Sequence, residues 1–277
     1  MNLQNIFKEI ETVDPEFHER ISPRREAIKN MTGFGKKLAL GAVPFALGSL
    51  FTKAYGQTQP TGINDILNFA LTLEYLESEF YTRGVATYGT VMPNTPAIAA
   101  LTLIRDDENH HVTFLKSVLG SAAVAKPNFD FTAKGTFPDP FLPTNYAVFL
   151  ALAQAFEDTG VRAYKGQAPY LMSNKTVLGA ALNIHSVEAR HASHIRQMRK
   201  AGGDTTLKPW ITGNSRGTIP AAAQAVYSGE ELETQGGVKI SGIAVDGVTI
   251  SVAAATEAFD EPLSYGDALA IAKLFLA

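Results

Sequence analysis

The chain has 277 residues, of which 45% are hydrophobic and 18% are charged. This composition is sufficient for a buried core and excludes a disordered or collagen-like chain. The formal net charge is -3 with only 24 lysines and arginines, so we expect no basic face able to neutralise a phosphate backbone and no nucleic-acid partner. The absence of cysteine excludes disulfides, thiolate metal sites and a cysteine nucleophile.

Residues 1–57 have the features of an export leader. Their uncharged apolar run, residues 38–52, is shorter than the roughly 20 residues that a membrane-spanning helix needs. The run follows Arg24-Arg25, a pair that resembles a twin-arginine signal, and precedes small residues around Ala54 that suit cleavage. We therefore expect export to the periplasm or cell envelope of a bacterium, and no stable membrane span in the mature form. The alternative is a surface helix in which the arginine pair is incidental.

Residues 58–203 carry four segments with helical periodicity. The four periodic stripes run from Ile63 to Tyr81, from Leu101 to Val118, from Tyr146 to Tyr164 and from Val177 to Met198. Each apolar stripe contains acidic residues, which departs from the usual helix with an apolar inner face and a polar outer face. The acids therefore need a partner inside the fold.

The connections between these segments predict their topology. Short joints around Pro93 and between Pro169 and Asn174 imply antiparallel neighbours. Residues 120–144 contain four prolines and are long enough to run back along a helix. We therefore predict an all-α core, a four-helix bundle with one long crossover.

Residues 204–277 form a predicted C-terminal extension of different composition. Residues 243–252 predict a β-hairpin that turns at Asp246-Gly247, and Ser264 predicts the cap of a terminal helix. No active-site pattern occurs here. We expect the extension to cover an end of the bundle or to make a contact in a homo-oligomer.

Two Glu-x-x-His motifs carry the chemistry of the chain. Residues three apart on a helix share a face, so Glu108 and His111 point to one place, and Glu188 and His191 do the same. The other two stripes place one acid each among their apolar residues, Glu74 and Glu157. Buried carboxylates this close would repel one another and destabilise the fold, and divalent cations remove that penalty. The six side chains therefore predict a site for two metal ions.

The donor set restricts the metal. Carboxylate and imidazole ligands suit iron, manganese or zinc, whereas magnesium and calcium prefer oxygen ligands alone. We expect two iron ions, with manganese or zinc as alternatives that the sequence leaves open.

The chain resembles the ferritin-like di-iron carboxylate proteins, and in particular the bacterial ferritin-like domain proteins related to desiccation-related proteins. The likeness rests on LNFALTLEYLESEFY (residues 67–81), FEDTGVRAYKG (156–166), IHSVEARHAS (184–193) and TEAFDEPL (256–263), and the ligand order is that of bacterioferritin. The resemblance implies a ferritin-like four-helix bundle. It implies terminal carboxylates from Glu74 and Glu157, bridging carboxylates from Glu108 and Glu188, terminal imidazoles from His111 and His191, and a catalytic tyrosine, Tyr81, hydrogen-bonded near the metals.

Three features of the sequence depart from these relatives, and each argues against one property that some of them have. Asn109 stands where bacterioferritin has its haem-ligating methionine, so we expect no haem. The lack of cysteine excludes a rubredoxin-type electron relay. The leader and the C-terminal extension argue against a 24-subunit iron-storage cage.

These features predict an oxidoreductase that oxidises Fe(II) with dioxygen or hydrogen peroxide, removing peroxide or detoxifying metal. Two other functions stay open, a non-catalytic metal buffer and a stress-protective or desiccation-protective bundle.

Several neighbouring residues have more than one interpretation. Glu77 is either an additional ligand or a carboxylate that supports the ligands or faces solvent. His185 is either a satisfied core histidine or a residue of a substrate channel or an exchange ligand. Asp107 and Asp158 adjoin ligands in the sequence, and we expect them to orient the histidines. Tyr164 is expected mainly to pack in the core.

Overall fold

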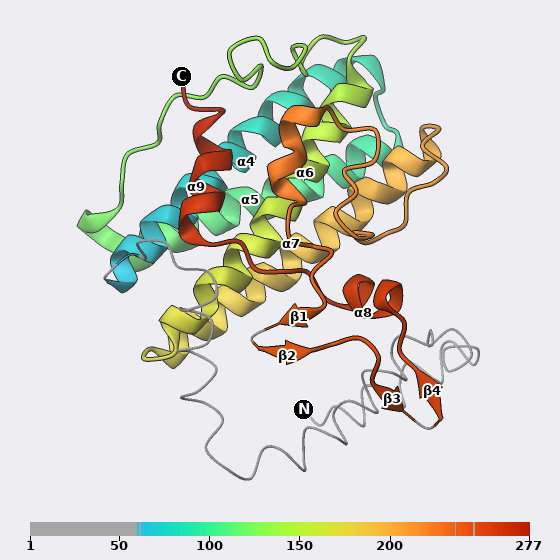
Figure 1. Cartoon of the computed structure of the whole chain (residues 1–277). Helices are drawn as coiled ribbons and strands as arrows, with labels where there is room; N and C mark the ends of the chain where they lie inside the picture. Colours follow the sequence, from blue (N-terminus) through green and yellow to red (C-terminus); the bar gives the residue numbers. More distant parts are fainter. Residues whose placement is uncertain (1–59, 61, 236, 246) are drawn as a thin grey trace, which may run out of the picture.

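A computed structural model of the chain describes residues 60, 62–235, 237–245 and 247–277. The predicted leader, residues 1–57, lies outside the described residues. Four long helices form a bundle (Figure 1) and are α4 (Ile63–Val91), α5 (Pro96–Leu119), α6 (Tyr146–Gln167) and α7 (Lys175–Ala201). Helix α4 packs against α5, and α6 packs against α7, which are the two predicted hairpins. None of the described helices is long and apolar enough to cross a membrane.

Local sequence signals account for the starts of two of these helices. The Thr95 side chain accepts a hydrogen bond from the Ile98 backbone N–H, and Pro96 occupies the first helical position. Asn174 caps α7 in the same way, by accepting from the Val177 N–H. Helix α5 ends at Leu119, and the next residue, Gly120, has a φ of 55° that is costly for any residue with a Cβ. These local signals therefore determine where α5 starts and ends and where α7 starts.

The predicted long crossover connects the hairpins. It starts with the short 3-10 helix η1 (Gly120–Ala122) and reaches α6 after an irregular stretch that runs along the outside of the bundle (Figure 1). Phe131 and Phe141 of this stretch pack against Phe80 of α4, with ring centroids 5.3 and 5.6 Å away. The crossover therefore contributes aromatic side chains to the core.

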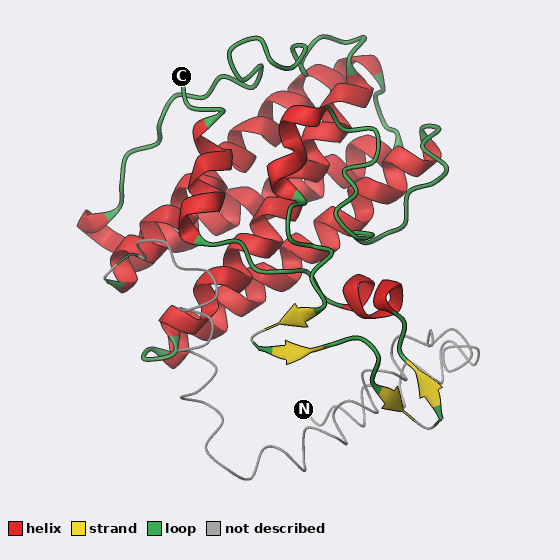
Figure 2. Ribbon diagram, viewed as in Figure 1, coloured by secondary structure: helices red, strands yellow, loops and turns green. Residues whose placement is uncertain are grey.

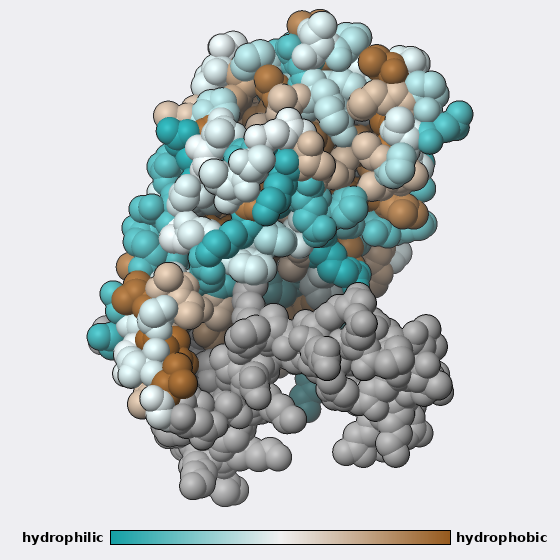
Figure 3. Space-filling model, turned by 90° about the vertical axis from the view of Figure 1, so that its right-hand side faces the viewer, coloured by the Kyte–Doolittle hydropathy of each residue, from teal (hydrophilic) through white to brown (hydrophobic). Residues whose placement is uncertain are grey.

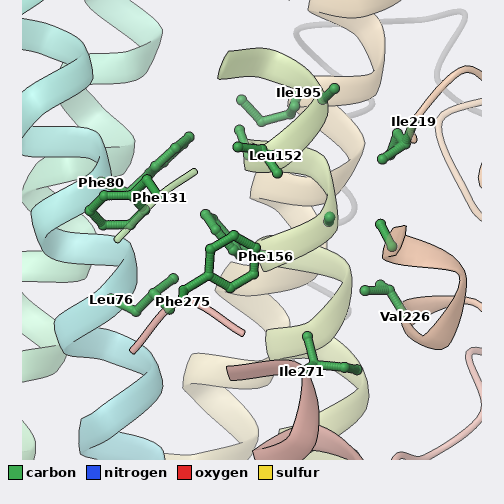
Figure 4. Packing of buried hydrophobic residues seen from close by; sticks show 14 of the residues in the cluster. Leu76, Phe80, Phe131, Leu152, Phe156, Ile195, Ile219, Val226, Ile271 and Phe275 are labelled. Carbon is green, nitrogen blue, oxygen red and sulfur yellow. The ribbon is translucent and has the colours of Figure 1, made fainter. Parts of the chain in front are cut away.

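The C-terminal extension completes the core on the outer side of α6. It contains η3 (Ala221–Val226), α8 (Val252–Ala258) and α9 (Tyr265–Lys273), and both η3 and α9 pack along α6. Figure 4 shows Phe275, which follows α9, beside Phe156 of α6, and their ring centroids are 4.8 Å apart. Every residue from Phe149 to Tyr164 is consequently buried. The extension thus packs along the side of α6. The expectation that it covers an end of the bundle or makes a contact in a homo-oligomer stays a prediction.

Among the residues that the structure describes, the named strands form two small antiparallel hairpins (Figure 2). The predicted hairpin is present as β3 (Ala244–Val245) and β4 (Val248–Thr249), but its second strand stops before residue 252 because Ser251 caps α8. A second hairpin, β1 (Thr234–Gln235) with β2 (Val238–Lys239), was not predicted. The fold class is therefore confirmed as an all-α bundle with a small extension that contains a hairpin and a terminal helix.

The surface viewed in Figure 3 mixes hydrophilic and hydrophobic residues. On the described part of this face, hydrophobic side chains occur in several separate groups among hydrophilic ones. This distribution is ordinary for a folded chain, because much of any protein surface is apolar.

Candidate metal centre

Each helix of the bundle contributes to one cluster of buried polar side chains. Helices α4 and α6 supply Glu74 and Glu157, and α5 and α7 each supply one Glu-x-x-His pair. The four carboxylates have no solvent exposure, and the two histidines are at most 8% exposed. The structure thus brings together all six residues that the sequence predicted as ligands.

Two ring nitrogens lie at the centre of the cluster. The Nδ1 atom of His111 lies 3.0 Å from Glu74 Oε2, 3.0 Å from Glu108 Oε2 and 3.5 Å from Glu188 Oε1. The Nδ1 atom of His191 lies 2.9 Å from Glu108 Oε1 and 3.3 Å from Glu157 Oε2. Each imidazole therefore faces carboxylate oxygens from two helices other than its own. His111 also faces Glu108, its partner in the Glu-x-x-His motif.

Glu108 spans the two halves of the cluster. Its Oε2 faces His111 and its Oε1 faces His191. The cluster divides into two groups able to hold a cation, one with Glu74 and His111 and the other with Glu157 and His191, and Glu108 and Glu188 belong to both. Within each group, one ligand atom from every residue lies within 4.8 Å of the others. The central pair of carboxylates thus lies where bridging ligands would lie.

The spacing of these atoms fits metal ions of the expected size. Two ligand atoms about 2.1 Å from one ion lie about 3.0–3.5 Å apart at angles between about 90° and 110°. The nitrogen-to-oxygen distances in both groups fall between 2.9 and 3.5 Å. Carboxylate oxygens with two imidazole nitrogens also form the donor set that suits iron, manganese or zinc.

Unpartnered atoms give a second test of the fit. Both carboxylate oxygens of Glu188, together with Glu157 Oε2, are buried without a hydrogen-bond partner among the described residues. Glu108 Oε1 and His191 Nδ1 also lack hydrogen bonds, although they are 2.9 Å apart. Leaving such groups without partners is costly, and cations would satisfy all of them. The residues present therefore fit a metal centre.

Gly160 on α6 makes room for the carboxylate of Glu188. A Cβ on Gly160 would lie 2.6 Å from Glu188 Oε2 and 3.2 Å from its carboxyl carbon. Any other residue would push the carboxylate of Glu188 away from the centre. A glycine is required at position 160 because the Glu188 carboxylate approaches the α6 backbone closely, and not because the backbone angle is unusual.

Two tyrosines donate hydrogen bonds to Glu157 and Glu74 of the cluster. The Tyr81 hydroxyl donates to Glu157 Oε1, and the Tyr164 hydroxyl donates to Glu74 Oε1. Burial, followed by the charges of the neighbouring carboxylates, raises the pKa of both phenols well above 10. Both hydroxyls therefore stay protonated and remain donors. Tyr81 lies where the resemblance places it, whereas the contact of Tyr164 was missed.

Asp107 orients one of the histidines, as expected. Its Oδ2 lies 3.2 Å from His191 Nε2, which fixes the ring with Nδ1 turned inward. The same expectation for Asp158 was wrong. Asp158 forms a bidentate ion pair with Arg196, at 2.6 and 2.5 Å, and accepts a hydrogen bond from Tyr227. This pair lies on the side of α6 that faces the extension.

Two further candidates lie outside the ligand groups. Glu77 is buried beside a cavity of about 10 Å³ that Ile271 and Phe275 also line, and neither group able to hold a cation includes it. His185 Nδ1 lies 2.9 Å from the Val161 carbonyl oxygen, which matches its interpretation as a satisfied core histidine.

Burial and close contacts within the cluster shift the pKa values of its side chains. Burial raises the pKa of Glu108 to about 7, against the lowering effect of its contacts with the two histidines. Burial lowers the pKa of His111, but its contacts with Glu108 and Glu74 outweigh this and raise it to about 10. The charge of Glu157 and contact with Glu108 likewise raise the pKa of His191 to about 11, against burial. The metal-free cluster thus retains protons that metal ions would displace.

Comparison with known proteins agrees with this geometry. A family model described as ferritin-like domain matches residues 63–201, from the start of α4 to the end of α7 and about half of the chain. Neither the comparison with curated proteins nor that with solved structures gives a match. The matched residues include all six members of the buried cluster. The chain therefore belongs to the ferritin-like domain family.

Proposed function

We propose that the protein binds two transition-metal ions, in the first place iron, and oxidises Fe(II) with dioxygen or hydrogen peroxide. The observation that carries this proposal is the position of Glu108, whose two oxygens face two different histidines. A single cation would need only one of the two groups that share this carboxylate. Two ions engage both groups and compensate all four carboxylates that these groups contain.

The bound ions would supply electrons: two Fe(II) give up one electron each, and hydrogen peroxide with two protons becomes two water molecules. The terminal ligands would be Glu74 with His111, and Glu157 with His191. The protein's own residues would hold the site in place. Glu108 and Glu188 balance the charge of the pair, and burial of all four carboxylates excludes water.

Two tyrosines and one aspartate would support the ligands. Tyr81 and Tyr164 hold a proton against the outer oxygen of each terminal carboxylate, which keeps the inner oxygen free for a metal. Asp107 holds His191 with its Nδ1 inward. Such contacts raise the affinity and order of a site without taking part in electron transfer.

The setting of the reaction is also part of the proposal. The twin-arginine-like residues of the leader support export to the periplasm or cell envelope, where the protein would remove peroxide or detoxify metal. Fractionation of the host, with the protein detected in the cytoplasm alone, would contradict this.

Elemental analysis and a ferrous oxidation assay test the function together. Protein purified from its own host is compared with a Glu108→Gln, Glu188→Gln double variant, which keeps side-chain volume, and with Glu79→Gln, which changes an acid outside the ligand groups. We expect wild type and Glu79→Gln to carry iron, manganese or zinc and to oxidise added Fe(II), and the double variant to do neither. Metal without oxidation would favour a metal buffer, and no metal above the level of the double variant would leave only a protective bundle.

A further inference from the structure

A cleft of about 350 Å³ is lined by residues of α6, α7 and the C-terminal extension. We call it the outer cleft. Its floor consists of buried residues, among them Asp158, Arg196 and Ile211, and its rim of half-buried ones, among them Trp210 and Asp260. The volume lies within the range of about 300–1,000 Å³ that is typical of small-molecule sites. The outer cleft is therefore large enough for a ligand.

The outer cleft lies on faces of α6 and α7 that differ from those of the metal centre. Asp158 follows Glu157 by one residue on α6, and Ala192 follows His191 by one residue on α7. Successive residues of a helix point about 100° apart, so the two sets of side chains leave the same helix turns in different directions. None of the six cluster residues lines the outer cleft. It is thus separate from the metal centre.

Two of the three charged side chains that line the outer cleft compensate each other. Arg196 donates to both carboxylate oxygens of Asp158, at 2.6 and 2.5 Å, and Tyr227 donates a further hydrogen bond to that carboxylate. The third charged side chain is Asp260. An anionic ligand would meet a guanidinium that is already paired and a carboxylate that repels it. The charges of the outer cleft therefore favour a cation.

The Asp260 carboxylate has no partner of its own. Lys165 of α6 donates to the backbone oxygen of Asp260 and not to its carboxylate. Among the residues that the structure describes, none forms an ion pair or hydrogen bond with this carboxylate. Burial, and after it the charge of Asp158, raises the pKa of the Asp260 carboxyl, although the charge of Lys165 lowers it. A cation bound beside Asp260 would compensate its charge.

Asp260 also belongs to a sequence segment that the metal centre leaves unexplained. The segment is TEAFDEPL, residues 256–263, which is one of those that carry the family likeness. Neither of the groups able to hold a metal among the described residues includes a residue of this segment. A role in the outer cleft gives the segment a function of its own.

Trp210 gives the outer cleft an aromatic wall. Its Nε1 donates to Glu257 Oε2 at 3.0 Å, which holds the indole in place. The Nζ of Lys208 lies 6.0 Å from the centroid of the indole, but Lys208 is paired with Glu257. Aromatic rings attract organic cations and also pack against hydrocarbon groups. The wall therefore suits a cation that carries an apolar group.

We propose that the outer cleft binds a small organic cation, a primary ammonium ion carried on an aromatic or aliphatic group. The ammonium donates to the Asp260 carboxylate, and the hydrocarbon part packs against Trp210. The apolar walls distinguish this ligand from a bare metal ion, and neither metal-binding group of the described residues includes Asp260. The inference goes beyond the proposed function, because it concerns a different site and a different ligand.

The fluorescence of Trp210 tests the proposal on the full metal-loaded chain, because Trp210 is the only tryptophan in the sequence. The probes are benzylamine, benzyl alcohol and benzoate, which share one ring and differ in charge. We expect a saturable change with benzylamine, at an affinity at least about tenfold higher than that of benzyl alcohol, and no binding of benzoate. Equal affinities for the amine and the alcohol, tighter binding of benzoate, or no saturable change up to about 10 mM benzylamine would each overturn the proposal.

A crystal soaked in benzylamine locates the ligand. We expect its nitrogen within about 3 Å of an Asp260 carboxylate oxygen and its ring beside Trp210. Benzylamine bound only at another place would overturn the proposal.

Removing the charge of Asp260 tests its role in recognition. Asp260→Asn keeps the shape of the side chain and should weaken benzylamine binding about tenfold or more, while the affinity for benzyl alcohol stays within about twofold. Asp65→Asn removes an exposed acid in the first turn of α4 and should change neither affinity. Undiminished binding of benzylamine by Asp260→Asn would overturn the proposal.

Filling the outer cleft gives a second test that leaves the charge of Asp260 in place. Ala189→Leu adds bulk to the cleft from α7 and should abolish binding of both benzylamine and benzyl alcohol. Unchanged affinity for benzylamine in this variant would overturn the proposal even if Asp260→Asn failed to fold. Wild-type protein that binds benzylamine but carries no metal would contradict the proposed function and leave this inference standing.

Discussion

The hydroxyl of Tyr81 donates a hydrogen bond to Glu157, a residue of the other helical hairpin. The reciprocal bond joins Tyr164 to Glu74. Each tyrosine follows the cluster glutamate of its own helix by seven residues and donates to the cluster glutamate of the other helix. The two helical hairpins are thus joined at the level of the buried cluster by a symmetric pair of hydrogen bonds.

Removing either hydroxyl should weaken metal binding without unfolding the protein. Tyr81→Phe and Tyr164→Phe each leave a terminal carboxylate free to turn, and loss of such an outer contact typically costs about 10–100-fold in metal affinity or activity. Competition with a chelator measures the change. Tyr75→Phe is the matched control, because that hydroxyl bonds the Val124 backbone oxygen and not the centre. Equal effects in all three variants would contradict the assigned role.

A methyl group at position 160 should disrupt the second bridging ligand. The Cβ of Gly160→Ala would lie 2.6 Å from Glu188 Oε2, so Glu188 must move, and we expect loss of at least one of the two ions. Gly179→Ala on α7 is the control, because its Cβ meets nothing within 4 Å, and it should stabilise the helix by about 0.5–1 kcal/mol. Metal stoichiometry measures the loss of ions in Gly160→Ala, and thermal unfolding measures the stability of both variants. Full metal loading of Gly160→Ala would show that Glu188 is not required where the structure places it.

The stability of the metal-free protein should fall as pH rises from about 5 to 9. Glu108, with a pKa near 7, and His111, with a pKa near 10, hold protons in the folded state that the unfolded chain releases nearer its ordinary values of about 4.5 and 6.5. The folded state thus binds more protons across this range, and stability declines with pH. Added metal should reverse the trend, because deprotonated ligands bind it better. Urea unfolding, measured once with a chelator and once with added metal, gives the free energy of unfolding at each pH. A rise in this free energy between pH 5 and 9 in the presence of the chelator would contradict the prediction.

The extension depends on a buried ion pair on the outer side of α6. Arg162 Nε lies 2.7 Å from Glu230 Oε1 and donates to the Glu261 backbone oxygen, and both Arg162 and Glu230 are 1% exposed. Arg162→Met would leave Glu230 buried without its cation and with only the hydrogen bond from the Glu261 backbone N–H, so we expect a loss of about 3–5 kcal/mol in the free energy of unfolding. A compensating Glu230→Gln should restore part of it.

Arg105→Met serves as the control for this change. Arg105 pairs with Asp106 near the surface, and the loss there should stay below about 1 kcal/mol. Equal losses at the two arginines would mean that the buried pair does not hold the extension in place.

Local helix geometry explains how much of this arrangement could be predicted from the sequence. The Glu108 and His111 side chains meet because residues three apart always share a helix face, whatever the rest of the fold does. The same periodicity shows why the expectation for Asp158 failed. Successive residues on a helix point about 100° apart, so the neighbour of Glu157 in sequence faces Arg196 and the extension.

Contacts between distant segments were harder to predict. The role of Tyr164 depends on how α4 and α6 face each other, although its spacing from Glu157 repeats that of Tyr81 from Glu74 and was available as a signal. The burial of α6 on all sides depends on where the extension packs, which no periodicity within residues 204–277 encodes. Strands of two residues, as in β1 and β2, are too short for an alternating pattern.

Anomalous X-ray scattering from a crystal of the metal-loaded protein locates the ions themselves. We expect two scattering peaks inside the bundle, one next to His111 Nδ1 and one next to His191 Nδ1, with Glu108 between them. A single peak would contradict the bridging role of Glu108, and a crystal soaked in iron or manganese with no peak among these residues would refute the metal centre.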